Sequence, residues 1–351
     1  MERYSAAVLL VARDPVYGEH DPGPGHPERP VRLRAVEQGI AAARVDDAIT
    51  ALVPRDASVE ELERVHSPRL VARLQALCAE GGGAIDPDTV ASSGSFDAAR
   101  RAAGAGLAAV DALQRGDGTA AFLAVRPPGH HARPATSMGF CLLNNVAVTA
   151  GALADRGERV CIVDYDAHHG NGTQEIFYAD ARVLYVSFHE WPLYPGTGRL
   201  HEMGTGDGAG LTCNFPLPSG ATGDVYLRAL DEVVAPVVER FDPTWVLVSC
   251  GFDAHRDDPL TGLGLSAGDY GLLAASVTEL APTGRLIVFL EGGYDLDALE
   301  SSVAATLPPL LGLGGRATEP ATAGGPGSNV VEAASTLWAD SAGGGPERSS
   351  L

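Results

Sequence analysis

Residues 160–171 read Val-Cys-Ile-Val-Asp-Tyr-Asp-Ala-His-His-Gly-Asn, so a short apolar run is followed at once by carboxylates and imidazoles. Such a run predicts a strand buried on both faces of a parallel sheet. Alternate residues of an extended chain share one face, which points Asp164, Asp166 and His168 the same way. Burying these groups is costly unless a cation or hydrogen bonds compensate. The segment predicts a metal site at a strand end; the alternative is a set of solvated polar residues.

The same alternation of apolar runs and helix-like Ala/Leu/Arg stretches continues along most of the chain. It predicts an α/β fold: an open, mostly parallel β-sheet flanked by helices on both faces, in a single domain. Ligands bind such sheets beyond the carboxyl ends of the strands, so the loops after the strands are expected to converge on one cleft. The predicted strands are 7–11, 121–125, 160–163, 183–187, 245–249 and 286–290. The predicted helices are 30–44, 58–80, 95–115, 142–155, 223–240 and 266–281.

The composition narrows the class of protein. A net charge of −20 argues against binding to nucleic-acid phosphates or an anionic membrane surface. The five cysteines sit singly, without a Cys-x-x-Cys pair, which fits a reducing compartment. The start of the chain lacks an apolar signal core, and no apolar run has the length needed to span a bilayer. We therefore expect a soluble cytoplasmic protein, and its oligomeric state stays open.

The composition changes after about Gly312. Residues 313–351 are rich in Gly, Ala, Pro and Ser, a mixture that buries too little apolar surface to stay ordered. We predict a catalytic domain over 1–312 and a C-terminal tail over 313–351, with a short docking helix at 330–338.

Two adjacent histidines follow the second predicted strand. Arg126-Pro127-Pro128-Gly129-His130-His131 combines stiff prolines, a permissive glycine and two imidazoles, which suit proton transfer. Both rings cannot easily be cationic at once, so their titrations should be coupled. We expect Asp164 to bond one histidine and Asn171 the other. The alternative is a loop with two exposed histidines.

Asp253, in a loop after the strand at 245–249, completes a three-ligand set with Asp166 and His168. Two carboxylates and one imidazole leave coordination positions open, as catalytic zinc requires. We interpret His255 as a loop histidine rather than a ligand, and Asp258 as a turn or structural residue.

Tyr294 follows the predicted strand at 286–290 and two glycines. In a cleft, its phenol would be an oxyanion donor, worth about 3 to 4 kcal/mol in a dry site. Ordinary packing is the commoner role for a tyrosine after two glycines.

Together these motifs resemble the histone deacetylase and acetylpolyamine amidohydrolase family, in the manner of a class II-like bacterial member. The resemblance covers about residues 1–312, and its motifs occur in the family's order. They are Gly-His-Pro-Glu-Arg-Pro (25–30), Arg-Pro-Pro-Gly-His-His (126–131), Gly-Phe-Cys (139–141), Asp-x-Asp-x-His-His-Gly-Asn-Gly-Thr (164–173), Tyr-Pro-Gly-Thr-Gly (194–198), Gly-Phe-Asp-Ala (251–254) and Glu-Gly-Gly-Tyr (291–294).

The resemblance implies the arginase/deacetylase fold, one Zn²⁺ per chain and a structural K⁺. The implied zinc ligands are Asp166, His168 and Asp253, and the implied catalytic residues are His130, His131 and Tyr294. The potassium would lie near Asp164, Asp166, His168, Ser187 and Phe188, several of them through backbone oxygens. Phe140 and Tyr194, beside Gly139, would wall a narrow substrate tunnel, and Arg32 would line an internal channel. Whether Zn²⁺ or Fe²⁺ is the metal in the cell stays open.

The implied reaction is hydrolysis of an acetylated amine by metal-activated water. His131 would take the proton of the water, Tyr294 would stabilise the oxyanion, and His130, oriented by Asp164, would tune the base. Asn171 departs from the class I pattern, in which a carboxylate often holds the second histidine. Tyr194 adds a hydroxyl where a phenylalanine is common, which leaves the shape of the rim undetermined.

Three functions compete. The first is a zinc amidohydrolase that removes acetyl or other acyl groups from lysine-like or polyamine amines. The second is an arginase-like ureohydrolase with two manganese ions, although residues 168–171 and 252–254 lack the extra carboxylates expected for a second metal. The third is a binding module for acetylated ligands. The substrate could be a protein lysine, a polyamine or a small metabolite, because rim loops 86–94 and 190–206 set access. Asp88 either grips the substrate there or forms a turn.

Overall fold

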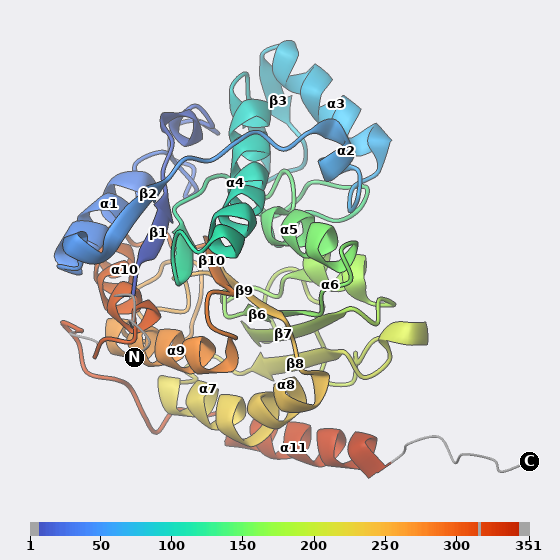
Figure 1. Ribbon diagram of the computed structural model, residues 1–351, viewed down its shortest axis with the longest axis vertical. Helices are drawn as coiled ribbons and strands as arrows, with labels where there is room; N and C mark the ends of the chain where they lie inside the picture. Colours follow the sequence, from blue (N-terminus) through green and yellow to red (C-terminus); the bar gives the residue numbers. More distant parts are fainter. Residues whose placement is uncertain (1–6, 315–316, 344–351) are drawn as a thin grey trace, which may run out of the picture.

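Eight parallel strands form one sheet through the middle of the molecule (Figure 1). The computed structural model describes residues 7–314 and 317–343. The strand order is β2-β1-β5-β10-β9-β6-β7-β8. The strands are β1 (Leu9–Ala12), β2 (Ile49–Leu52), β5 (Ala120–Leu123), β6 (Val160–Asp164), β7 (Val183–Glu190), β8 (Thr212–Leu217), β9 (Trp245–Cys250) and β10 (Leu286–Leu290). Two further strands, β3 (Gly82–Ala84) and β4 (Val90–Ser92), pair as a small antiparallel sheet.

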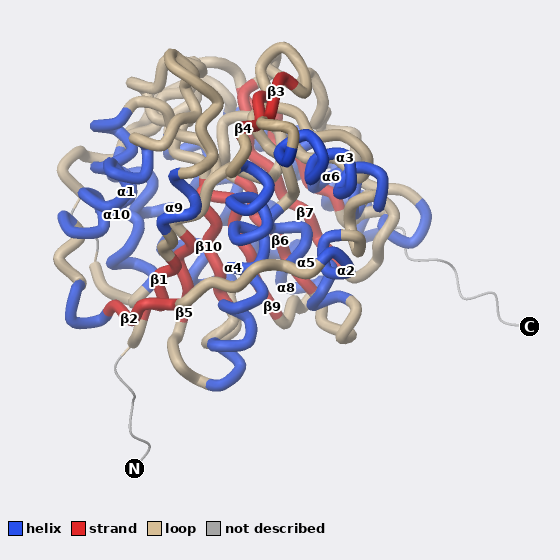
Figure 2. The backbone as a smooth tube through the Cα atoms, turned by 90° about the horizontal axis from the view of Figure 1, so that it is seen from above, coloured by secondary structure: helices blue, strands red, loops and turns tan. Residues whose placement is uncertain are grey.

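Helices cover both faces of the large sheet (Figure 2). One face carries α2 (Val59–Leu62), α3 (Pro68–Ala79), α4 (Ser95–Arg115), α5 (Asn145–Ala154) and α6 (Asn171–Phe177). The other carries α1 (Arg32–Ala42), α7 (Gly223–Ala229), α8 (Ala235–Phe241), α9 (Ala267–Leu280), α10 (Leu296–Leu310) and α11 (Ser328–Gly343). The short helices are η1 (Pro15–Gly18), η2 (Asp46–Ala48), η3 (Gly206–Gly208) and η4 (Leu230–Val234), a π-helical turn.

The strand β6 shows why the sheet has two hydrophobic cores. Val160 and Ile162 pack into the core under α4 and α5, whereas Cys161 and Val163 pack into the core on the opposite face. All four side chains are fully buried. Burying one such aliphatic side chain contributes about 1.5 to 3 kcal/mol, so a continuous apolar run stabilises a strand covered on both sides. The predicted parallel, two-faced sheet is confirmed.

The two edge strands, β2 and β8, were not predicted from the sequence. Neither has a continuous apolar run: β2 exposes its two middle residues, and β8 contains Asn214 and Pro216. Proline removes a ladder hydrogen bond and is tolerated in a strand at a sheet edge, where β8 lies.

The predicted helices also needed correction in two respects, since some helices were missed and others are divided. The sequence pattern did not predict α6 and α10, because α6 begins inside the polar motif after β6 and α10 carries two prolines, Pro308 and Pro309, in its last turn. The single helix predicted over 58–80 is two helices, α2 and α3, and that predicted over 223–240 is three pieces, with η4 between α7 and α8.

Residues 317–339 pack against the domain. Asp269 accepts hydrogen bonds from the backbone and the hydroxyl of Thr322, and helix α11 buries Val331, Ala334 and Trp338. Residues 317–339 pack in this way because a few apolar side chains are spaced along one helix face, and α11 includes the segment 330–338 where a docking helix was expected. Residues 315–316 and 344–351 lie outside the described residues, and the domain boundary at 312 stays a prediction.

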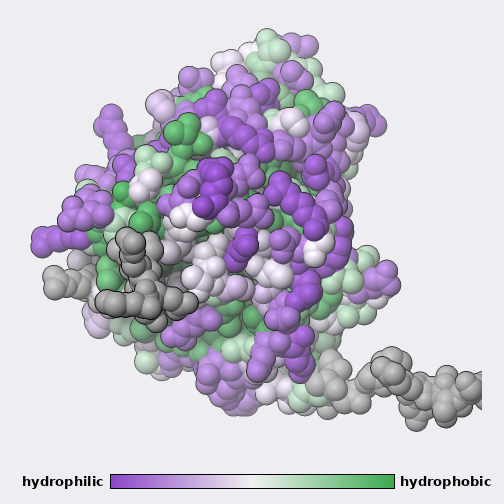
Figure 3. Space-filling view, viewed as in Figure 1, coloured by the Kyte–Doolittle hydropathy of each residue, from purple (hydrophilic) through white to green (hydrophobic). Residues whose placement is uncertain are grey.

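The molecular surface is mainly polar. The face in Figure 3 is mostly hydrophilic, with scattered hydrophobic patches between the charged side chains. Within residues 7–314 and 317–343, no helix combines the length and the apolar character that crossing a membrane requires.

Candidate active site

Four neighbouring strands bring the polar motifs together. In the order β5-β10-β9-β6, each strand leads directly into a loop that carries candidate residues. These are His130 and His131 after β5, Tyr294 after β10, Asp253 after β9, and Asp166 and His168 after β6. The convergence expected for the carboxyl ends of parallel strands is therefore present.

Asp166, His168 and Asp253 form one cluster of ligand atoms that all lie within 4.8 Å of one another. His168 Nδ1 is 3.2 Å from Asp166 Oδ1 and 3.0 Å from Asp253 Oδ2. Backbone N–H groups hold the carboxylates: Ala167 donates to Asp253 Oδ1 and Gly292 donates to Asp166 Oδ2, each at 2.8 Å. The cluster is thus assembled from two loops: the loop after β6 carries Asp166 and His168, and the loop after β9 carries Asp253.

The donor set fits a zinc ion. Burial raises the pKa of Asp253, and the neighbouring charge of Asp166 raises it further. Two carboxylates buried this close together oppose each other's ionisation unless a cation lies between them. Two oxygen donors and one imidazole nitrogen are ligands that catalytic zinc uses, with positions left for substrate and water. The candidate site therefore has both the donors and the electrostatic need for a divalent metal.

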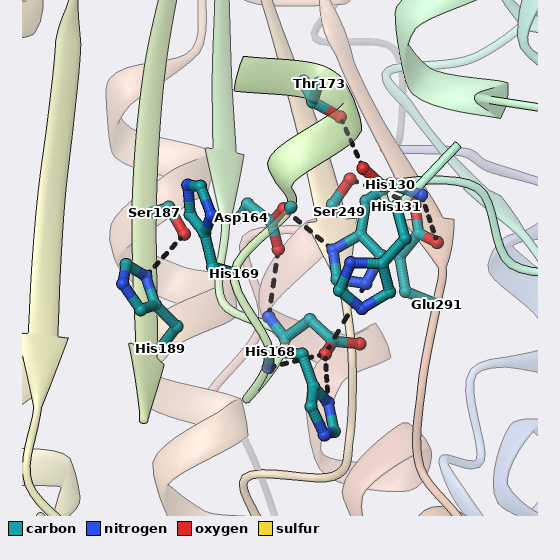
Figure 4. Close-up of polar contacts among 12 residues, drawn as sticks. His130, His131, Asp164, His168, His169, Thr173, Ser187, His189, Ser249 and Glu291 are labelled. Carbon is teal, nitrogen blue, oxygen red and sulfur yellow. Dashed lines mark hydrogen bonds and ion pairs between the residues drawn. The ribbon is translucent and has the colours of Figure 1, made fainter. Parts of the chain in front are cut away.

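The tandem histidines have different partners, and Figure 4 shows His130 facing Asp164. His130 Nδ1 donates to Asp164 Oδ2 at 3.0 Å, and Tyr185 Oη donates to the same oxygen at 3.0 Å. His131 Nδ1 donates to Asn171 Oδ1 at 2.8 Å. Since Nδ1 carries the proton in each neutral ring, the lone pair is on Nε2. The pairing of the histidines with Asp164 and Asn171 follows the sequence expectation.

The same partners push the two histidine pKa values apart. Burial lowers the pKa of His130, but the carboxylates of Asp166 and Asp164 outweigh it and hold that pKa well above its usual range. Burial, followed by the charges of His130 and His168, holds the pKa of His131 well below its usual range. His130 therefore favours the cation and His131 the neutral ring, the form that can accept a proton.

Aromatic rings lie beside the cluster, with the ring centroid of Tyr194 6.5 Å from that of His168. Phe140 lies edge-on to Tyr294 with ring centroids 5.8 Å apart, and Tyr194 lies edge-on to His131 at 5.2 Å. Gly139 has φ +57°, and a Cβ there would come within 2.5 Å of His131 Cδ2. A side chain at 139 would therefore push into the histidine, which explains the glycine.

The loop at 86–94 contacts Phe140 through Thr89. Thr89 Oγ1 accepts from the Phe140 backbone at 3.1 Å and donates to Asp88 Oδ1 at 3.0 Å. His26 Nε2 donates to the Asp88 carbonyl at 3.0 Å, and its ring lies 4.7 Å from that of Phe140. Asp88 thus lies close to Phe140, and one of its carboxylate oxygens accepts the hydroxyl of Thr89.

Arg32 is fully buried behind Tyr294. Its Nε donates to the Gly293 carbonyl at 2.7 Å and its Nη2 to the Glu291 carbonyl at 2.6 Å, while Cζ lies 5.0 Å from the Tyr294 ring centroid. Glu28 Oε1 accepts from Arg32 Nη1 at 2.9 Å. Arg32 therefore supports the backbone of the tyrosine loop from below.

The residues named for potassium are only partly gathered. Asp164 pairs in register with Ser187 on the adjacent strand β7. Ser187 Oγ bonds to His189 Nδ1 at 3.0 Å, and the Phe188 ring stacks on Phe215 in the core. Only backbone oxygens of Phe188 could therefore serve an ion at this place.

The second histidine of the pair after Ala167 lies outside the metal cluster. Figure 4 shows His169 turned toward Ser187 and His189, away from His168. Its Nδ1 bonds to Thr197 Oγ1 at 2.8 Å and its Nε2 to Gln174 Oε1 at 2.9 Å. His255 is also outside the cluster, with Nε2 at 3.1 Å from Glu319 Oε2.

Sequence reasoning missed several supporting residues. Glu291 is buried, and its Oε2 accepts from the backbone of Gly129 at 2.6 Å and of His130 at 3.2 Å. Burial raises its pKa to about 7. Glu28, in the motif near the start, also bonds to Arg126. Both glutamates stand inside quoted motifs, but only the folded chain reveals their partners.

Comparison with known proteins places the chain in a family. The histone deacetylase domain matches residues 26–310. A probable deacetylase of Archaeoglobus fulgidus is 43% identical over 290 residues, covering 80% of each chain. A histone deacetylase-like amidohydrolase of Pseudomonas aeruginosa is 37% identical over 276 residues, covering 77% of this chain and 73% of that one.

A crystal structure of the HD domain of HDA15 superposes with a TM-score of 0.88 at 35% identity, covering 96% of this chain and 95% of that one. The fold is that of arginases and deacetylases. The chain belongs to the histone deacetylase family and is a hydrolytic deacetylase.

Proposed function

We propose that this protein is a zinc-dependent amidohydrolase that removes acetyl groups from lysine-like or polyamine amines. The proposal is carried by three features that lie together. They are the ligand cluster of Asp166, His168 and Asp253, the ring of His131 with its centroid 6.0 Å from that of His168, and the phenol of Tyr294, whose pKa is raised by burial and by the nearby Asp253 carboxylate. Among the described residues a second buried group of potential ligands, His130, Cys141 and Glu291, lies beside this cluster. Its His130 is bonded to Asp164, and its Glu291 is bonded to backbone N–H groups and to Ser249, which favours one metal over the arginase-like pair.

The chain's own residues divide the chemistry. His131 Nε2 accepts the proton of the attacking water, because Asn171 keeps the proton of the neutral ring on Nδ1. The charge of His130, held by Asp164, stabilises the negative charge that develops in the transition state. The Tyr294 hydroxyl donates to the oxyanion formed from the amide carbonyl. The protonated histidine pair then returns a proton to the leaving amine, which gives acetate and a free amine.

A zinc ion held by Asp166, His168 and Asp253 would supply Lewis acidity, polarising the amide carbonyl and making a water molecule more acidic. A structural potassium near Asp164 and Ser187 belongs to the same proposal, supported by their adjacency across β6 and β7.

The walls made by Phe140 and Tyr194 favour a linear acyl-amine substrate. Flat rings on both sides exclude water and accept a methylene chain, while a branched substrate would meet them. An acidic protein with Asp88 near the rim favours substrates with positive charge beyond the acylated amine.

The test compares zinc-loaded protein on an acetyl-lysine peptide and on an acetylated polyamine, following acetate release. Tyr294→Phe should lower kcat about 100-fold, the cost of removing one oxyanion donor. His131→Ala should also cause a severe loss. Turnover like wild type in either variant would contradict the role proposed for the residue that it replaces.

Metal counting and a single-turnover experiment separate the rival functions. About one zinc per active chain supports the deacetylase, whereas two manganese ions with urea production would support the arginase-like enzyme. Binding of the acetylated peptide without any acetate release in a single turnover of metal-loaded protein would support a binding module.

A further inference from the structure

The backbone at Tyr294 is held by a carboxylate from another loop. Asp258 Oδ2 accepts the N–H of Tyr294 at 2.7 Å and that of Asp295 at 3.3 Å, and its Oδ1 accepts the N–H of Leu260 at 3.0 Å. Asp258 is only 5% exposed. A buried carboxylate that receives several backbone donors fixes the position of each of them.

The hydrogen bond from Tyr294 N–H to Asp258 lies in the part of the loop after β10 that has the fewest other hydrogen bonds to hold it. Gly292 and Gly293 precede Tyr294, and Gly293 has φ +117°, so the chain there has wide conformational freedom. The bonds of Arg32 and Asp166 hold Glu291, Gly292 and Gly293 but not the tyrosine itself. Asp258 supplies the restraint at the tyrosine backbone.

A simple capping role does not account for Asp258. Helix α10 has its own N-cap, since the Asp295 carboxylate accepts from the N–H of Ala298 at 2.9 Å. Asp258 also belongs to the loop that begins at Asp253, and its N–H donates to the carbonyl of His255 at 2.9 Å. It therefore joins the loop of one proposed zinc ligand to the loop of the proposed oxyanion donor.

We propose that Asp258 is a positioning residue for the reaction, which sets the Tyr294 hydroxyl at the distance from the ligand cluster that oxyanion stabilisation requires. This inference rests on the proposed function. Its physical basis is that catalytic hydrogen bonds are steep in distance, so a displacement of about 1 Å can cost up to about 100-fold in rate.

The test is a double-mutant cycle on zinc-loaded protein with an acetyl-lysine peptide. Asp258→Ala should lower kcat about tenfold or more, with KM within about twofold, because the lost interaction is made in the transition state. In a Tyr294→Phe background the same change should alter kcat less than about twofold, because no hydroxyl remains to be positioned. Equal losses in both backgrounds would overturn the proposal.

Two further variants at position 258 keep the test decisive. Asp258→Asn retains an amide oxygen for the Tyr294 and Asp295 donors, so it should keep kcat within about threefold of wild type. A loss as large as that of the alanine variant would refute the acceptor role. Asp258→Ser, whose hydroxyl is too short to span these contacts, goes through the same cycle in case the alanine variant does not fold.

Asp269 provides a matched control. It is another buried aspartate, and its carboxylate holds the backbone of Ser266 and Thr322, away from Tyr294. Asp269→Ala should reduce stability in urea, yet change kcat by the same factor with Tyr294 or Phe at 294.

Bound zinc is measured in every variant, and zinc loss in Asp258→Ala would count against the proposal. If wild type releases no acetate, the proposed function fails. If wild type is active and Asp258→Ala lowers kcat by the same factor with Tyr294 and with Phe at position 294, only this inference fails.

Discussion

His66 should make the stability of this protein depend on pH. Its Nδ1 donates to the Arg133 carbonyl at 3.0 Å, and its Nε2 accepts the N–H of Asn144 at 2.9 Å. Protonation of Nε2 would place its N–H against the N–H of Asn144, where no hydrogen bond can form. Asn144 in turn donates to the Ala132 carbonyl and to Thr173 Oγ1, each at 3.1 Å, so it helps to hold the loop of the tandem histidines.

The structure sets the size and the sign of the effect. Burial lowers the pKa of His66 to about 4, against about 6.5 in an unfolded chain. The folded state therefore favours the neutral ring, and the stability it contributes is present above pH 6.5 and is lost as the pH falls toward 4. A difference of about 2.5 pKa units corresponds to about 3 kcal/mol, lost over that window.

The assay is urea unfolding of wild type and His66→Gln at steps from pH 7.5 to 4.5, with equal zinc loading. A glutamine amide can donate to the Arg133 carbonyl and accept from Asn144 without titrating. The difference in unfolding free energy between the two proteins should shift by about 2 to 3 kcal/mol in favour of the variant at low pH. If the unfolding free energies of the two proteins change in parallel with pH, the reasoning is refuted.

Three further perturbations have defined outcomes. Glu28→Ala should lower the unfolding free energy by about 3 to 5 kcal/mol in urea, because the buried guanidiniums of Arg32 and Arg126 lose their partner. Gly139→Ala should lower kcat with bound zinc unchanged, because the added Cβ would meet the His131 ring at 2.5 Å. Chelation of the metal should abolish acetate release and lower the melting temperature, since it leaves two buried carboxylates facing each other, and added zinc should restore both.

Each of these changes has an internal control. Asp117→Ala breaks an exposed pair with Arg115 and should cost at most about 1 kcal/mol. An equal loss for Glu28→Ala would contradict the buried-pair argument. Gly18→Ala, where an added methyl group meets nothing within 4 Å, should leave kcat unchanged. For chelation, activity that survives complete zinc removal would exclude the metal from the reaction.

The amino-acid sequence by itself determined the inner strands of the sheet and the candidate ligands, because both are local properties. Val160 to Val163 are apolar without interruption, so any fold must bury them on two faces, and Asp164, Asp166 and His168 alternate directly after them. Edge strands such as β8 carry no such signal, since one side of the strand has no neighbour and Pro216 is tolerated there.

Only the tertiary structure decided which polar groups hold these residues in place. Glu28, Glu291 and Asp258 have no periodicity that marks them, and each finds its partners on a segment far away in the chain. Hydrogen-bond partners are set by distance and direction in space, which a one-dimensional pattern does not contain. The sequence therefore identified the side chains that are candidate ligands or acid–base groups. The packing of β5, β10, β9 and β6 decided which of them lie next to one another.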